Sequence, residues 1–254
     1  MEDAVERGDA SKVAELLRQD PGFKVNLRLG GGGWTILHYA CNESISSPVI
    51  PLLLALPGID VNLKSRHGFT PFYYACYNGC TPCVREMLKD SRVKVNEPDN
   101  DGHPPLWQAA ANGHLDVIKW WIASGKEMDL GTPGEFMTDA IGAGTRRHKT
   151  EAVTLLESFQ SDATKTRHAM RVELGWYDDQ VAKMFALVVF ISDGLLQIND
   201  TTSPSPAARF FTIARQLPLE LQMVLCYRLV GTAKEIIPGK DSEEAFKWLA
   251  RRLW

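Results

Sequence analysis

The sequence predicts an all-α protein, built as a solenoid of stacked helical repeats and continued by a packed, all-helical C-terminal module. A Val-Asn pair recurs three times, as Val25-Asn26, Val61-Asn62 and Val95-Asn96. A glycine recurs with nearly the same period, as Gly33, Gly68 and Gly102. A period near 33 residues marks a repeat array in which each unit is a turn followed by two helices. Beyond about residue 160 the period stops, but helix signals continue.

Each of the three glycines opens a related string of residues. The strings are Gly33-Trp-Thr-Ile-Leu-His-Tyr-Ala-Cys41, Gly68-Phe-Thr-Pro-Phe-Tyr-Tyr-Ala-Cys76 and Gly102-His-Pro-Pro-Leu-Trp-Gln-Ala-Ala110. They resemble the ankyrin motif, in which glycine, threonine, proline, leucine, histidine, a variable residue and two small residues follow in order. This resemblance implies an ankyrin-repeat solenoid of helix-turn-helix units with short hairpin loops, and it implies binding rather than catalysis.

The register of the motif extends beyond the three clear copies. Residues around Thr138 and His148 fall in the same slots as Pro104 and His114, which indicates a degenerate last unit. The N-terminal residues match only the second half of a unit, as a terminal capping repeat should. The expected array therefore covers residues 1–157, and the helical C-terminal domain covers 158–254. The expected units are an N-terminal cap at 1–26, then 27–62, 63–96, 97–130 and the degenerate 131–157.

Threonine-proline and serine-proline pairs mark the expected helix starts. The hydroxyl group accepts a free backbone N–H, and the proline that follows has no N–H to leave unpaired. Thr70-Pro71 begins one inner helix, and Thr81-Pro82 begins the outer helix of the same unit. Ser47-Pro48 is the corresponding outer start one unit earlier, where Pro51 should loosen the first turn.

The C-terminal third predicts further helices with one clear loop. The expected helices are about 179–198, 207–217, 219–230 and 245–253, and residues 199–206 (Asn-Asp-Thr-Thr-Ser-Pro-Ser-Pro) form the loop. The degenerate last unit carries Gly142 and Gly144 in its inner helix, and glycine weakens a helix interior. We therefore expect apolar residues of the tail to cover Leu155 and Leu156. The chosen contacts are Phe185, Val188 and Val189.

Composition narrows the class of protein. The chain has 254 residues and a formal net charge of −3, so neither nucleic acid nor a membrane surface is an expected partner. Its longest apolar run, residues 184–191, falls short of the ~20 residues that a membrane helix needs. The acidic N-terminus lacks a signal-peptide core, and five cysteines are an odd number for a disulfide framework. We expect a location in the cytoplasm or the nucleus.

Three cysteines form a spacing that metal sites also use. Cys76, Cys80 and Cys83 give C-x3-C-x2-C, with His67 nearby, and four such ligands can hold zinc. The repeat register favours packing instead, because Cys76 and Cys83 fill core slots and Cys80 fills a histidine slot at a helix start. Free cysteine behaves as a small buried hydrophobic residue. We expect no metal and no cofactor.

Motifs for catalysis are weak throughout the chain. Neither the glycine run at 30–33 nor Gly239-Lys-Asp-Ser242 has the spacing of a phosphate-binding loop. His38 and His114 fill ordinary ankyrin slots, and the resemblance implies that His38 bonds the capping Thr35 while His114 supports a loop. We expect no enzyme. The remote alternative is an unrecognised site in the tail, where the candidate residues are Asp178, Asp179, Asp193 and His168.

The exposed slots of the ankyrin motif carry aromatic residues in neighbouring units. In ankyrin folds the hairpin tips and the outward positions of the inner helices form a concave surface. Aromatic side chains and arginine are enriched at the energetic centres of protein interfaces. The predicted partner-binding residues are Trp34, Tyr39, Lys64, Arg66, His67, Phe69, Tyr74, Tyr77 and His103. The expected function is therefore a non-enzymatic adaptor that binds a protein partner on this face.

A second interpretation concerns the C-terminal domain. Leu217-Pro218-Leu219-Glu220-Leu221 resembles the opening Leu-Pro-x-Glu-Leu of F-box motifs, which attach a substrate receptor to a cullin-type ubiquitin ligase adaptor. The same pattern is also an ordinary helix start, with proline in the first position and an acidic residue in the first turn. Both interpretations stay open from the sequence alone.

Overall fold

The computed structural model describes residues 1–254 except 21, 132–137, 194–205, 230–244 and 246–254. The chain divides into two compact units, Met1–Met170 and Arg171–Trp254. The regular secondary structure of the described residues is helical, apart from one isolated β-bridge between Leu29 and Trp34, so the predicted all-α class is confirmed.

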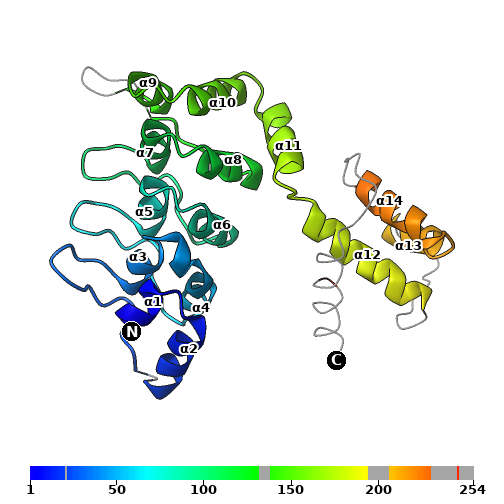
Figure 1. Cartoon of the computed structure of the whole chain (residues 1–254), viewed down its shortest axis with the longest axis horizontal. Coiled ribbons are helices and arrows are strands. Elements are labelled where there is room, and N and C mark those ends of the chain that lie inside the picture. Colours follow the sequence, from blue (N-terminus) through cyan, green and yellow to red (C-terminus); the bar gives the residue numbers. More distant parts are fainter. Residues whose placement is uncertain (21, 132–137, 194–205, 230–244, 246–254) are drawn as a thin grey trace. The chain divides into compact units, whose positions relative to one another are not determined.

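The first unit is a stack of helical hairpins (Figure 1). A short helix α1 and helix α2 form the N-terminal cap, and each later repeat adds one inner and one outer helix. The hairpin loops between repeats project to one side of the inner helices. The helices are α1 (Glu2–Glu6), α2 (Ala10–Gln19), α3 (Ile36–Ala40), η1 (Ser44–Val49), α4 (Ile50–Leu54), α5 (Pro71–Tyr77), α6 (Thr81–Lys89), α7 (Pro105–Asn112), α8 (Leu115–Ser124), α9 (Ala140–Arg146), α10 (Thr150–Ser161) and α11 (Ala163–Glu173).

The asparagine of each Val-Asn pair joins its repeat to the next one. The side chain of Asn26 donates to the Gly58 carbonyl at 2.8 Å and accepts the Asp60 N–H at 2.9 Å. Asn62 does the same with the Arg92 carbonyl and the Lys94 N–H, both at 2.9 Å. Asn96 accepts the N–H of Asp129 at 3.1 Å. The valine before each asparagine packs into the core, so the pair fixes both the burial and the spacing of successive units.

A second set of bonds runs from one slot of each inner helix to the following repeat. The slot holds His38, Tyr73 and Trp107, three residues after Thr35, Thr70 and Pro104. His38 Nε2 lies 2.9 Å from the Phe69 carbonyl, the Tyr73 hydroxyl donates to Asp99 at 2.7 Å, and Trp107 Nε1 donates to the Thr138 carbonyl at 2.8 Å. His38 also accepts the Thr35 N–H through Nδ1 at 3.0 Å, which confirms its predicted capping role.

The core of the first unit is a continuous apolar stripe between inner and outer helices. Small residues lie where helices of adjacent repeats meet, and Cys41, Cys76, Ala109 and Ala110 are all fully buried. Large side chains fill the remaining space, with the Phe72 and Trp121 rings in edge contact at 5.0 Å. Burial of these side chains supplies the main favourable term in folding.

The outer helix of the second repeat departs from the expected start at Ser47-Pro48. The segment Ser44–Val49 is a 3-10 helix, and the α-helix begins only at Ile50, with Pro51 in its first turn. Two prolines three residues apart remove two N–H donors from this stretch, so it lacks the full set of α-helical bonds. The irregular start predicted from Pro51 therefore extends over the whole segment Ser44–Val49 that precedes the outer helix of this repeat.

Gly144 has a packing role in the degenerate last repeat. A Cβ atom at this position would lie 2.9 Å from Val153 Cγ2 and 3.4 Å from the Ala110 carbonyl oxygen. Helix α9 can therefore pack closely on α7 and α10 only because residue 144 has no side chain. Helix α11 adds to the same end of the array: Thr166 donates to the Ser158 carbonyl at 3.0 Å, and Met170 packs against the core.

The second unit contains the described helices α12 (Asp178–Ser192), α13 (Pro206–Ala214) and α14 (Leu219–Leu229). Phe185, Val188 and Val189 were expected to cover the last repeat, but they pack in the core of this second unit with Val181, Cys226 and Tyr227. The expected loop at 199–206 lies almost entirely outside the described residues, and so does the last helix at 245–253 apart from Ala245. None of the described helices is both long and apolar enough to cross a membrane.

Replacing Asn62 by alanine should lower the free energy of unfolding by about 1–2 kcal/mol, because it removes two inter-repeat hydrogen bonds. The Lys94 amide should exchange with solvent faster than in the wild type, as hydrogen exchange read by mass spectrometry would detect. Asn62→Asp keeps the acceptor for the Lys94 N–H and should keep that protection. Equal Lys94 exchange in Asn62→Ala and the wild type would show that the asparagine does not join the repeats.

The free energy of unfolding should decrease as the pH is lowered, because His38 is buried in its neutral form. Burial lowers the pKa of this histidine to about 4, from 6.5 in the unfolded chain. The folded state therefore binds fewer protons, and the His38 contribution is fully present above pH 6.5 and is lost as the pH falls toward 4. Between pH 7 and pH 5 this loss is about 2 kcal/mol. Urea unfolding at both pH values should show this loss in the wild type and in an exposed control, His67→Gln. It should be absent from His38→Gln.

Candidate protein-binding surface

Five aromatic side chains predicted to share one face do come together. Their rings form an unbroken chain of contacts across two repeats, with centroid separations of 5.1 Å for Tyr39–Trp34, 4.5 Å for Trp34–Tyr74, 5.2 Å for Tyr74–Phe69 and 5.9 Å for Phe69–Tyr77. We call these five residues the aromatic surface. Trp34 and Phe69 follow the hairpin glycines, whereas the three tyrosines lie on the inner helices α3 and α5. Two different parts of each repeat therefore build one feature.

The five rings differ in exposure, and one expectation is wrong. Tyr74 was expected to be exposed, but only 8% of it is accessible, because the Trp34, His38 and Phe69 rings surround it. Trp34, Tyr39 and Phe69 are partly exposed, and Tyr77 is 41% exposed. Tyr74 is thus the buried centre of the aromatic surface, and its neighbours supply the accessible area.

The three basic residues beside the aromatic surface have different surroundings. Lys64 is partly buried and already engaged: its ammonium group donates to the Pro98 carbonyl at 2.8 Å and lies 3.2 Å from a Glu97 carboxylate oxygen. The hydrogen bond from Lys64, together with its positive charge, lowers the pKa of Glu97. Arg66 and His67 are exposed at the hairpin tip. Lys64 therefore joins two hairpins, while Arg66 and His67 are more accessible to a ligand.

Comparison with known proteins decides the family of this region. A family model described as "Ankyrin repeats (3 copies)" matches residues 45–132. The chain contains ankyrin repeats. The human protein named SMC5-SMC6 complex localization factor protein 1 is 34% identical over 159 residues, which are 60% of this chain and 15% of the relative. The cattle protein of the same name is 33% identical over the same length. A human transient receptor potential cation channel, subfamily A member 1, is 35% identical over 98 residues, 37% of this chain and 8% of the channel.

These coverages limit the comparison to a part of each protein. The chain aligns with only about a seventh of the length of the localization factors. Ankyrin repeats are protein–protein interaction modules, and the three copies in the family match include the hairpin and inner helix that carry Phe69, Tyr74 and Tyr77.

His103 continues the same row of ankyrin slots one repeat further on. Its ring lies 4.1 Å from the Trp107 ring, and its Nδ1 lies 3.6 Å from a carboxylate oxygen of Asp99. The sequence prediction did not include Trp107 as a neighbour of the site, although Trp107 occupies the same slot of the ankyrin motif as His38. That slot was the signal that could have identified it.

Asp99, Asp101 and His103 form the only group within the described residues whose ligand atoms lie close enough to share a metal ion. The Asp99 carboxylate is already bound by the Tyr73 hydroxyl and by the backbone N–H groups of Asp101 and His103. It therefore closes the ankyrin hairpin. The tail residues Asp178, Asp193 and His168 do not belong to such a group within the part of the chain that is described.

The cysteine prediction is wrong for two residues. Cys41 and Cys76 are free and buried, as expected for residues that pack in the core. Burial raises the pKa of both thiols, so they stay protonated. Cys80 and Cys83 were also expected to be free, but they are joined in a disulfide. The sulfur of Cys83 faces backbone carbonyls of Ala40 and Glu43 rather than apolar neighbours. A spacing of three residues at a helix start brings the two side chains together.

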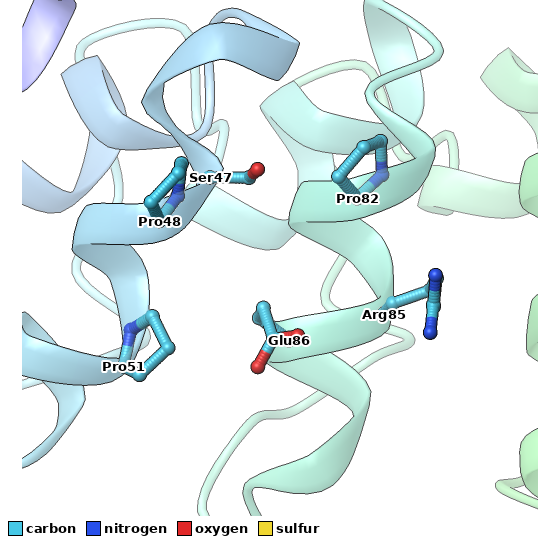
Figure 2. Close-up of a pocket in the computed structure, with 6 residues that line it drawn as sticks. All are labelled: Ser47, Pro48, Pro51, Pro82, Arg85 and Glu86. Carbon is cyan, nitrogen blue, oxygen red and sulfur yellow. The ribbon is translucent and has the colours of Figure 1, made fainter. Parts of the chain in front are cut away.

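A shallow pocket lies on the opposite, outer-helix side of the same repeats, between η1 and α4 of one and α6 of the next (Figure 2). Ser47 and Pro82 point toward one another across it, and Pro48, Pro51, Arg85 and Glu86 complete the lining. Arg85 also lies over the Trp120 ring, 4.1 Å from its centroid. The pocket is a gap between outer helices that the two-proline 3-10 segment leaves open.

The F-box-like segment follows helix α13 and begins helix α14. Leu217 is partly buried and Pro218 is exposed, while Leu219 and Leu221 are 52% and 51% exposed. Glu220 lies in the same first turn. Two leucines of the motif are therefore accessible instead of forming part of the core of the second unit.

The different exposure of Tyr74 and Tyr77 predicts different effects on stability. Tyr74→Ala should lower the free energy of unfolding by about 3 kcal/mol, because it leaves a cavity among three rings. Tyr77→Ala should cost less than about 1 kcal/mol, since Tyr77 is 41% exposed and lies at the edge of the aromatic surface. Denaturant unfolding of the two variants tests this, and equal losses would contradict the assignment of Tyr74 as the buried centre.

Proposed function

We propose that the ankyrin array is a non-enzymatic adaptor that binds a protein partner on the aromatic surface. The observation that carries the proposal is the continuous chain of ring contacts from Tyr39 to Tyr77, which spans two repeats and leaves four of its five rings accessible. Accessible clusters of large aromatic side chains are typical of interaction sites.

Rigid aromatic rings suit this role. A tyrosine or tryptophan held by its neighbours loses little conformational freedom on binding, so more of its contact energy appears as affinity. The buried Tyr74 supports Trp34 and Phe69 from within, and these in turn contact Tyr39 and Tyr77. The surface is therefore organised before a partner arrives.

The residues around the aromatic surface are proposed to set its specificity. Arg66 and His67 supply hydrogen-bond donors and positive charge at the hairpin tip, and His103 extends the same row by one repeat. Lys64 acts through position, since it fixes the spacing of two hairpins with Glu97 and Pro98. A partner with acidic or carbonyl groups beside an apolar segment matches this arrangement.

The relatives support a role in a larger assembly. The human relative is named as a localization factor of the SMC5-SMC6 complex. We propose that the array here recruits a protein of a comparable assembly inside the cell, with the cytoplasm or the nucleus as its location.

A second candidate function is a ubiquitin-ligase substrate receptor, with Leu217–Leu221 as the hook for a cullin adaptor. The accessible Leu219 and Leu221 favour it, because such a hook has to present its leucines to the adaptor. The array would then supply the substrate-binding surface in the same molecule. The two candidates share the aromatic surface and differ only in what the tail binds.

Photo-crosslinking from the aromatic surface tests the main proposal. Full-length protein carrying a benzophenone amino acid at Tyr77 should crosslink one protein in native lysate, whereas the same group at the exposed Lys89 of α6 should not. The affinity of the identified partner should fall by at least tenfold in Tyr77→Ala and in Arg66→Ala, because residues at the centre of an interface cost 2 kcal/mol or more. Lys89→Ala should bind as the wild type does.

Two outcomes separate the candidates. Unchanged affinity in Tyr77→Ala and Arg66→Ala would contradict binding at the aromatic surface. Co-purification of a cullin adaptor that is lost in a Leu219→Ala, Leu221→Ala double variant would establish the ligase function. If the protein retains its partner but no cullin adaptor co-purifies, the simple role of binding one protein partner remains.

A further inference from the structure

The first turn of α6 contains a cysteine pair in a setting that resembles redox-active sites. Cys80-Thr81-Pro82-Cys83 has the C-x-x-C spacing, and the Cα atoms of the two cysteines lie 5.3 Å apart, a separation that disulfides span. Cys80 is the N-cap of the helix, and its sulfur accepts the Cys83 N–H at 3.3 Å. A helix N-terminus and a C-x-x-C spacing both favour the thiolate, which is the reactive form of cysteine.

We propose that Cys80 and Cys83 form a reversible dithiol–disulfide pair, oxidised by a small disulfide such as glutathione disulfide and reduced by glutathione. The Cys80 thiolate attacks one sulfur of glutathione disulfide and releases one glutathione thiolate. The Cys83 thiolate then attacks the Cys80 sulfur of the mixed disulfide and releases the second. The protein loses two electrons and two protons, and glutathione disulfide gains them as two thiols.

Cys80 is the attacking residue because of its position. It caps the helix with its sulfur, as serine or aspartate does in other helices, and it retains a trace of solvent exposure where Cys83 has none. Opening of this first turn controls the rate at which a reagent reaches the sulfurs, but not the equilibrium between the two forms. Pro82, between the two cysteines, lines the outer pocket of Figure 2 at the same turn.

The two forms differ at the junction between neighbouring repeats. Cys83 Sγ lies 3.6 Å from the Ala40 carbonyl oxygen and 3.4 Å from that of Glu43, at the end of the preceding inner helix. In the dithiol form the Cys83 thiol donates a hydrogen bond there, and the disulfide has no hydrogen to donate. Oxidation therefore removes a bond between the repeat that carries Trp34 and Tyr39 and the repeat that carries Phe69 and Tyr77.

Thiol trapping across a range of glutathione ratios tests the proposal on the folded, full-length wild type. After equilibration the sample is quenched with acid, alkylated under denaturing conditions and digested with trypsin. The tryptic peptide 67–85 contains Cys76, Cys80 and Cys83 together. With rising glutathione disulfide we expect one transition to a form with a single alkylated cysteine, Cys76, and a Cys80–Cys83 bond located by fragmentation. Excess glutathione should reverse it without unfolding the protein.

Two variants serve as controls. Cys76→Ser should keep the transition, and Cys80→Ser, which retains a hydroxyl cap for the helix, should abolish it. Circular dichroism checks that each variant is folded. Three alkylated cysteines at every glutathione ratio would overturn the proposal, and so would a bond that involves Cys76. A bond that glutathione reduces only after unfolding would overturn it as well, because the pair would then be purely structural.

Discussion

One asparagine side chain per repeat fixes the distance between neighbouring units. No helical hairpin of this size buries enough apolar surface to fold by itself, so the array depends on the way its units stack. Asn26 and Asn62 each bind one carbonyl and one N–H of the next repeat, and thereby align two backbones that share no secondary structure. Burial of the preceding valine supplies the driving force, while the hydrogen bonds determine the register. The aromatic surface depends on that register, because its rings come from different repeats and meet only at this spacing.

The slot shared by His38, Tyr73 and Trp107 shows that one structural task can be performed by three chemistries. Each side chain carries a polar atom at its far end and reaches the hairpin of the following repeat. Histidine performs the task as a neutral base, which makes its contribution sensitive to pH, whereas the phenol and indole groups stay neutral over the same range. The side chains in this slot use their polar atoms to bond the next repeat. The rings available to a partner are therefore those at neighbouring positions of the motif.

The aromatic surface and the cysteine pair lie at the same junction, between the repeat of Trp34 and the repeat of Phe69. The hairpins and inner helices present the rings, and the start of the outer helix α6 holds the disulfide. The irregular η1 segment borders the outer pocket of this junction, where two prolines prevent a regular α-helix. The proposed binding surface, the proposed redox pair and the irregular η1 segment therefore all lie at one junction between repeats.

The sequence by itself determined the repeat architecture, the helix class and the grouping of the aromatic residues, because each of these follows from local spacing. The Val-Asn period, the Thr-Pro caps and the slots of Trp34, Phe69 and the tyrosines all lie within a window of about 35 residues. Only the tertiary structure decided what depends on contacts between windows. It showed that Tyr74 is enclosed by rings from two repeats, that Lys64 is held by Glu97, and that Phe185 and Val188 pack in a second core. The disulfide between Cys80 and Cys83 could have been predicted from the sequence, because a C-x-x-C pair at a helix start brings the two sulfurs together. The repeat register pointed instead to two free, packed cysteines. A period predicts which slot a residue occupies, and the neighbours across the stack decide whether that slot is open to solvent.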